Sequence, residues 1–331
     1  MQRFKNILCV VEPDKPCEPS LERAVTLTEN NQANLTIVAV APLVSAGIGM
    51  PEGGPISANL QATIVNSLRQ NLAKSVEPYQ QRIKLETKIL IGTPFLEIIR
   101  EVLRNERDLV IKVPERLDWL DRFFGSDDMH LLRKCPCPVW LIKPRVTKGF
   151  RRILAAVDLD DDHSPQEMES IVALNRQILE MASSLALAES AELHVVYVWD
   201  AIGESLMRHG PFVMTPEEQV NAYVEHVREH HAAILDDAMG VLASYIGPDT
   251  LDFLKPRTHL VKGWARKEIP LMTKRIEIDL VLMGTVARTG IPGFIMGNTA
   301  ETILNQLDCS VLAIKPPTFV SPIMLEDLEK S

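Results

Sequence analysis

A glycine-rich segment near the carboxyl end of the chain carries residue types that bind phosphate. Gly284-Thr285-Val286-Ala287-Arg288 follows a short apolar run, and Gly297-Asn298-Thr299 comes just before a helical pattern. Glycines let a backbone approach a phosphate, a helix N-terminus offers N–H donors, and Arg288 could add a charge-assisted bond. The candidate anion ligands are Gly284, Thr285, Ala287, Arg288, Gly297, Asn298 and Thr299.

The same backbone groups allow a second interpretation that needs no ligand. Asn298 and Glu301 match a capping box, with Asn in the place of the usual Ser or Thr. A capping box satisfies the first N–H groups of a helix with side chains of the chain itself. Capping and anion binding use the same donors, so the residues alone leave both interpretations open.

Two further candidates stand at the ends of other apolar runs. Asp158 could accept a hydrogen bond from a ribose hydroxyl or an adenine amino group, and Val198 could pack on a ring. The alternatives are a turn aspartate before residues 160–162 and an ordinary core valine. On its residue pattern alone, Asp158 fits the turn better.

Short strands that alternate with longer helices must position these candidates. In the second half we expect strands over 153–157, 193–198, 259–261, 280–283 and 311–314, and helices near 165–188, 216–244, 264–276 and 298–307. The apolar runs are continuous, as in strands buried on both faces of a parallel sheet. This alternation predicts a doubly wound α/β sheet, in which ligands bind beyond the carboxyl ends of the strands.

An internal repeat doubles this architecture. Residues 131–144 (LLRKCPCPVWLIKP) and 303–316 (ILNQLDCSVLAIKP) are identical at six of fourteen positions. The chain of 331 residues is also about twice the length of a typical domain. We therefore expect two tandem five-stranded domains, over 1–146 and 150–318, and a tail over 319–331.

The first half carries different residues where the second half has its candidate ligands. Glu12 stands in place of Asp158, and either Lys112 or Val113 stands in place of Gly284. Gly125-Ser126 is retained, but Asp127 and Asp128 follow it. Acids in a first helical turn stabilise the helix by about 0.3–1 kcal/mol and would repel a phosphate. We expect no nucleotide in the first half.

Composition excludes several other classes of function. The formal net charge is −9 and no Lys/Arg-rich block occurs, which argues against nucleic acid and against anionic membrane surfaces as partners. No apolar stretch reaches the roughly 20 residues of a membrane span, and the N-terminus has no signal-like segment. Five cysteines without framework spacing indicate a reducing compartment, so we expect a cytoplasmic protein.

Three segments carry a family resemblance: GTVARTGIPGFIMGNTAETI (284–303), HLLRKCPCPVWLIK (130–143) and CSVLAIKP (309–316). Through them, residues 3–320 resemble tandem members of the universal stress protein family. The family's ATP signature is Gly-x2-Gly-x9-Gly-Ser/Thr, and this chain keeps its spacing from Gly284 but has Ala287 and Asn298 at two positions.

The resemblance implies an adenine nucleotide α-hydrolase-like fold and a ligand in the second domain. That ligand would be ATP, with Mg²⁺, or a related adenine nucleotide. Asp158 and Val198 would flank the base, and Gly284, Gly297 and Asn298 would face the phosphates.

The resemblance also implies how the halves pack. In the family the last strands mediate dimerisation, and apolar edge strands left exposed would invite aggregation. We therefore expect an intramolecular pseudo-dimer with Trp140 as an anchor, and further homodimerisation stays open. The expected interface residues are Val139, Trp140, Leu141, Ile142, Val311, Leu312, Ala313 and Ile314.

The functional hypothesis is a non-catalytic stress-response protein that binds a small ligand. The alternatives are a slow ATPase and an interaction scaffold or carrier of a non-nucleotide metabolite. No P-loop, no Gly-x-Ser-x-Gly elbow and no paired acid and base occur in the sequence.

Two other clusters have simpler interpretations. His226, His230 and His231 lie on a predicted helix at a spacing that can hold a metal, but a third ligand is not evident and a solvated face fits better. Cys135 and Cys137 flank a proline, and they indicate buried thiols at a strand entry. We therefore expect no metal site.

Overall fold

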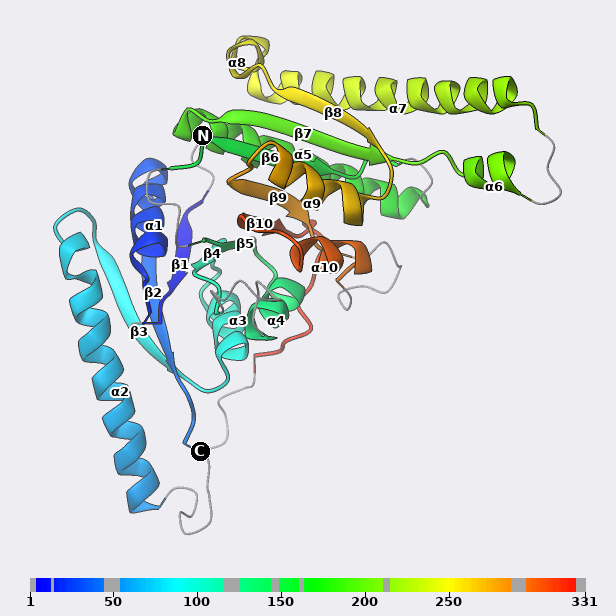
Figure 1. Ribbon diagram of the computed structural model, residues 1–331. Coiled ribbons are helices and arrows are strands. Elements are labelled where there is room, and N and C mark those ends of the chain that lie inside the picture. The colour runs from blue at the N-terminus through cyan, green and yellow to red at the C-terminus, as the bar shows by residue number, and fades with distance from the viewer. Residues whose placement is uncertain are drawn as a thin grey trace.

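The chain folds into strands and helices that alternate along both halves (Figure 1). The computed structural model describes residues 4–12, 15–44, 54–115, 126–143, 149–160, 164–210, 215–286 and 296–325. The first half contains β1 (Asn6–Val10), α1 (Glu18–Asn31), β2 (Asn34–Ala41), α2 (Pro55–Val76), a short 3-10 turn η1 (Glu77–Tyr79), β3 (Leu85–Ile91), α3 (Pro94–Arg104), β4 (Leu109–Lys112), α4 (Ser126–Lys134) and β5 (Val139–Leu141).

The second half repeats this series with two additional helices. It contains β6 (Arg152–Val157), α5 (Pro165–Glu189), β7 (Glu192–Trp199), α6 (Glu204–His209), α7 (Glu217–Ile246), α8 (Pro248–Leu254), β8 (Arg257–Lys262), α9 (Ala265–Arg275), β9 (Leu280–Gly284), α10 (Asn298–Leu304) and β10 (Ser310–Ile314). The α/β fold class and the five strands predicted for this half are confirmed. The sequence did not predict the short helices α6 and α8.

The strands form one sheet rather than two separate ones. Its order is β3-β2-β1-β4-β5-β10-β9-β6-β7-β8. Neighbouring strands run parallel within each half, and β5 and β10 pair antiparallel, with Leu312 opposite Trp140. The two predicted five-stranded sheets are therefore continuous, because the apolar edge strands pair with each other instead of facing solvent. This antiparallel pairing gives the expected intramolecular pseudo-dimer.

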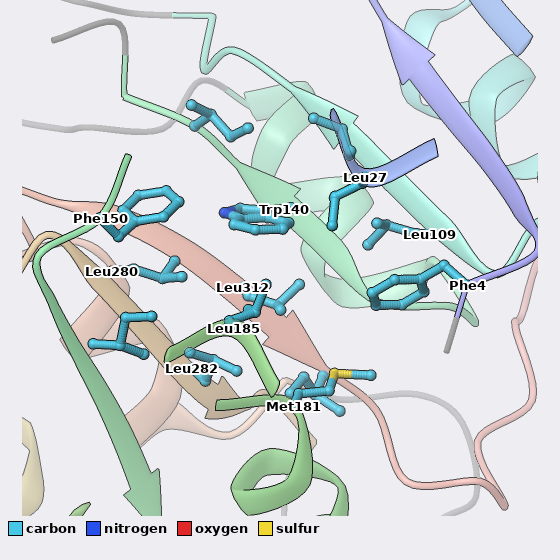
Figure 2. Packing of buried hydrophobic residues seen from close by; sticks show 14 of the residues in the cluster. Phe4, Leu27, Leu109, Trp140, Phe150, Met181, Leu185, Leu280, Leu282 and Leu312 are labelled. Atoms are coloured by element: carbon cyan, nitrogen blue, oxygen red, sulfur yellow. The ribbon is translucent and has the colours of Figure 1, made fainter. Parts of the chain in front are cut away.

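Two apolar cores cover the two faces of this sheet, and each runs across both halves. Side chains alternate between the faces of a strand, so neighbouring residues of β10 enter different cores: Leu312 packs with α1 and α5, and Val311 packs with the helices of the other face. In Figure 2, Trp140 lies between Leu109 of the first half and Phe150 and Leu312 of the second. The halves therefore share both cores.

An aromatic and charged cluster tightens the junction between the halves. The Trp140 and Phe150 rings stack with centroids 5.7 Å apart. The Arg23 guanidinium lies 4.6 Å from the Phe150 centroid and 5.5 Å from that of Trp140, and it pairs with Glu189. Trp140 thus contacts residues of both halves.

The last described segment, near residues 321–323, packs against the folded domains. The Ser321 hydroxyl donates to the Lys134 carbonyl oxygen over 2.8 Å, and Ile323 packs on one of the two cores. Residues 319–325 of the expected tail therefore contact the folded domains. Within the described residues, no helix combines the length and apolar character needed to cross a bilayer.

Candidate functional site

A cavity of about 350 Å³ lies at the carboxyl edge of the second half, where the strand order reverses. The chain leaves β6 for β7 on one side and returns to β9 on the other, which makes this the topological switch point of the half. We call it the switch-point cavity. Six predicted ligand residues line it: Asp158, Val198, Gly284, Gly297, Asn298 and Thr299.

Asp158 is held by a partner on α5 that the sequence did not reveal. The Asp158 backbone N–H donates to Asn175 Oδ1 over 3.0 Å, and Asn175 Nδ2 donates back to the Asp158 carbonyl oxygen over 2.5 Å. Asn175 is buried. Two reciprocal hydrogen bonds fix the backbone that carries the Asp158 carboxylate at the cavity wall.

Gly284 has a packing role that is independent of any ligand. A Cβ atom at this position would lie 2.6 Å from Leu174 Cδ2, well inside van der Waals contact. Leu174 also lines the cavity. The glycine therefore leaves room for the Leu174 side chain of α5, which forms part of one wall of the switch-point cavity.

The first turn of α10 opens on the cavity without a side-chain cap. Gly297 is the N-cap residue, and it has no side chain that could cap the helix. Glu301, the expected capping partner, instead forms an ion pair with Arg133 of α4 over 2.5 Å. The capping-box interpretation of Asn298 and Glu301 is therefore wrong.

Thr285 lies apart from the other candidates. Its side chain is fully buried, and its Oγ1 accepts a hydrogen bond from Lys315 Nζ over 2.5 Å. Lys315 Nζ also donates to the Leu132 carbonyl oxygen of the first half, and burial lowers the pKa of this amine to about 7. The structure thus places Thr285 at the junction of the halves, while Ala287 and Arg288 lie outside the described residues.

The strand register identifies the equivalent position in the first half. Lys112 pairs with Val10 of β1 as Met283 pairs with Ala156 of β6. Val113 is therefore the counterpart of Gly284, which resolves the one-residue ambiguity left by the sequence. The cavity at this point, lined by Val10, Glu12 and Val113 among others, measures only about 10 Å³.

A buried ion pair occupies the first-half position. Lys112 Nζ lies 2.5 Å from Asp128 Oδ1, and Asp128 Oδ2 accepts from the Glu115 backbone N–H over 2.8 Å. Both charged side chains are buried. Asp128 is thus paired with Lys112, and this ion pair fills the position. The expectation that no nucleotide binds in the first half stays a prediction.

A second cavity of about 640 Å³ adjoins the first at the ends of β7 and β8. It shares Val198, Ala265 and Thr299 with the switch-point cavity. Trp264 and Arg266 also line it, so we call it the tryptophan cavity. Its other described lining residues are Asp160, Asp200, Ile202, Tyr223, Val227, His230, His231 and Gly263.

The three histidines of α7 have different environments in the structure. His226 and His230 are exposed, as expected of a solvated face. His231 instead hydrogen-bonds through Nδ1 to the Tyr197 hydroxyl over 2.6 Å, and that hydroxyl donates to Asp160 Oδ1 over 2.9 Å. Across the described part of the chain, no three His, Cys, Asp or Glu side chains group closely enough to hold a metal.

The cysteine pair lies where the sequence placed it. Cys135 and Cys137 are buried just before β5, with their Sγ atoms 3.6 Å apart. The hydrogen bond between the two thiols, together with burial, raises the pKa of Cys137. Such thiols are poor nucleophiles, which agrees with a structural role.

Trp264, Arg266, Asp200 and Asn175 are among the lining residues that the sequence did not reveal. Trp264 and Asp200 follow the ends of β8 and β7, so the rule that ligands bind beyond strand ends would have found them if applied to every strand. Asn175 carries no such signal, because it lies in the middle of a long amphipathic helix.

Comparisons with known proteins agree on one family. The model of the "Universal stress protein family" matches residues 3–143 and again residues 149–315. Universal stress protein E of Salmonella typhi is 29% identical over 335 residues, covering 99% of each chain. A functionally unknown protein of Pseudomonas aeruginosa PAO1 has a similar solved structure, with a TM-score of 0.64 and 26% identity over 96% of this chain and 94% of that one.

A more distant solved structure supports the fold alone. It is a universal stress protein from Archaeoglobus fulgidus DSM 4304, with a TM-score of 0.59 and 16% identity. The match covers 94% of this chain and 98% of that chain. The similarity therefore extends over both halves.

Proposed function

This chain belongs to the universal stress protein family, with the family's domain present twice, and we propose that it is a non-catalytic stress-response protein that binds an adenine nucleotide or a related small ligand in its second half. The asymmetry between the halves carries this proposal. The switch-point cavity measures about 350 Å³, and its first-half counterpart about 10 Å³. Ligand cavities are commonly about 300–1,000 Å³, so among the described residues the space at the end of β9 can hold a ligand and the space at the end of β4 cannot. A separate first-half cavity of about 530 Å³ lies between β2 and α2 and is lined by Glu12, Val40 and Leu68 among others.

The lining residues suit a planar head group. Val198 and Met283 offer apolar contact to a ring, and the Asp158 carboxylate can accept from an amino or hydroxyl group. The backbone at Gly297 and the Thr299 hydroxyl lie on the α10 side of the cavity, where an anionic group would meet the start of the helix. If the ligand is ATP, Mg²⁺ would be held chiefly by the phosphates, because magnesium sites in proteins often use few protein carboxylates.

The chemistry of the lining supports binding rather than hydrolysis. Among the described residues that line the switch-point cavity, Asp158 is the one ionisable side chain. Hydrolysis of a phosphoanhydride needs a positioned base or water-orienting group as well as charge stabilisation. The slow-ATPase alternative therefore has little support in this lining.

Isothermal titration calorimetry with ATP, AMP and adenosine tests this function on the full chain. Val198→Phe fills the cavity and should lower affinity at least about tenfold, since one well-placed steric or contact change is commonly worth about 1–3 kcal/mol. Val40→Phe is the matched control, because Val40 occupies the equivalent half-buried position of β2.

The expected result is one site per chain, lost in Val198→Phe and kept in Val40→Phe. No binding at millimolar ligand, or equal loss in both variants, would contradict the proposal. Ligand recovered as ADP from the ATP titration would favour the ATPase instead.

An apolar groove favours one second candidate, a carrier of a non-nucleotide metabolite. A cavity of about 770 Å³ lies between α5 and α7 and is lined by apolar side chains such as Ile171, Ile234 and Leu242. Its volume is larger than that of the switch-point cavity, and charged side chains such as Glu169, Arg176 and Asp237 also line it. An apolar fluorescent dye should bind the wild type and should bind Val172→Trp more weakly, because the indole would fill the groove. The same substitution should leave the affinity for ATP unchanged.

A further inference from the structure

The two adjoining cavities fit a ligand larger than a mononucleotide. The switch-point and tryptophan cavities share Val198, Ala265 and Thr299, so one molecule can pass from one to the other without leaving the protein surface. We propose that they form a single two-lobed site for a dinucleotide, in which two nucleosides are joined by an anionic phosphate linker. The proposal rests on the function assigned above to the switch-point cavity.

The tryptophan cavity has flat walls for a second base. Trp264 is 59% exposed even though it is a large aromatic residue, and Tyr223 of α7 lines the same cavity. Gly263, just before it, has a φ of +142°, and a Cβ atom there would lie 2.9 Å from Glu268 Cγ. The turn thus requires glycine, and it presents the indole at a fixed place beyond the end of β8.

The Arg266 side chain lies near the point where the switch-point and tryptophan cavities meet. Arg266 follows the shared residue Ala265, and its guanidinium lies 4.9 Å from the Trp264 ring centroid. The Arg266 carbonyl oxygen accepts from Gln306 Nε2 over 3.2 Å, which ties the start of α9 to the segment after α10. A phosphate linker that crosses the junction would meet this guanidinium.

Acceptors for the second nucleoside lie on the other walls. Asp160 and Asp200 follow β6 and β7, whereas Arg266 lies on α9. The two carboxylates and the guanidinium therefore come from different walls of the cavity. Asp160 is fixed by the Tyr197 hydroxyl over 2.9 Å. Carboxylates in this position at strand ends accept hydrogen bonds from ribose hydroxyls.

The equivalent turn in the first half shows that the backbone conformation at Gly263 does not require Trp264 and Arg266. Gly92 has a φ of +141° and makes the same close approach to Glu97 as Gly263 makes to Glu268. At the next positions, Thr93 stands for Trp264 and Phe95 for Arg266, and Phe95 stacks on His130. The same turn thus carries Trp264 and Arg266 in the second half, and Thr93 and Phe95 in the first.

The test compares ATP with diadenosine tetraphosphate, which adds a second adenosine, in calorimetric titrations of the full chain. The dinucleotide should bind at least about tenfold more tightly, as one additional stacked base typically provides. Trp264→Ala should remove this advantage and leave ATP affinity unchanged. Phe253→Ala is the matched control, because Phe253 is 80% exposed on α8 and away from both cavities.

Each outcome decides the proposal. Equal affinity of the two ligands, or equal loss of both in Trp264→Ala, overturns the two-lobed site but leaves ATP binding in the switch-point cavity intact. If neither ligand binds, the proposed function fails and this inference fails with it. Quenching of indole fluorescence by the dinucleotide in the wild type, absent in Trp264→Ala, is an independent readout of stacking.

Discussion

Lys112 and Asp128 fill the first-half position that corresponds to the switch-point cavity. Strand register makes Lys112 the counterpart of Met283, and the repeat offset makes Asp128 the counterpart of Ala300. Met283 and Ala300 both line the switch-point cavity. The second half has Met283 and Ala300 at these two positions and an open cavity. The first half has Lys112 and Asp128, and their buried ion pair fills the equivalent space.

Lys112→Met should destabilise the protein strongly. The substitution leaves Asp128 buried without its cation, and breaking a buried pair typically costs about 3–5 kcal/mol. Lys112→Met with Asp128→Ala installs the second-half residues at both positions and should cost less than the single substitution. Urea unfolding of both variants measures this, and a double variant less stable than the single one would show that the pair is not the reason.

Lys315 should make stability depend on pH. Burial lowers its pKa in the folded chain to about 7, from an ordinary value of 10.5. Between these values the unfolded chain binds a proton that the native chain lacks, so the free energy of unfolding rises with pH from about 7 upward. The slope is at most about 1.4 kcal/mol per pH unit.

The comparison with Lys315→Met isolates this effect. Urea unfolding at pH 7, 8 and 8.5 should show a steeper rise for the wild type than for the variant, while other groups titrate alike in both. Parallel pH profiles for the two proteins would mean that Lys315 stays charged in the folded state.

At the scale of elements, the β5–β10 pair holds the halves together. Trp140 is fully buried, lies opposite Leu312 and stacks on Phe150. Trp140→Ala should cost about 3–5 kcal/mol, because it leaves a cavity at the junction. Trp264→Ala is the control, since an exposed tryptophan should change the free energy of unfolding by no more than about 0.5 kcal/mol. A Trp140→Ala variant as stable as this control would contradict the shared core.

The sequence predicted elements well because their signals are local. Continuous apolar runs such as Leu280–Gly284 are buried on both faces, and the structure makes them strands within two residues of the prediction. The internal repeat marked the last strands, and their apolar character indicated that they need a partner. Fold class and the pairing of halves therefore followed from patterns that lie within short windows.

The finer details of the site depend on contacts that sequence windows do not contain. Glu301 fits a capping box locally, but Arg133 of the other half provides a better partner. Thr285 follows the glycine of a ligand-type segment, yet Lys315 and Leu132 hold it at the junction. Whether Lys112 or Val113 matches Gly284 required the pairing with β1. In each case the local sequence is compatible with two arrangements, and a contact with a residue far away in the sequence determines which one forms.

At the scale of the whole molecule, each half depends on the other to cover an edge strand. All five residues of β10 are buried in the intact chain. A fragment of residues 149–331 would expose this apolar edge and should self-associate through antiparallel β10 strands. Light scattering should give about twice the fragment's mass, whereas a stable monomer at high concentration would show that the edge needs no partner.

The central claim is that two copies of one domain share a sheet while the second keeps a ligand-sized cavity at its switch point. A crystal structure of the full chain soaked with ATP tests it most directly. The account predicts one nucleotide per chain, with its ring near Val198 and Asp158 and its phosphates toward Thr299. A nucleotide in contact with Lys112 and Asp128 would contradict it.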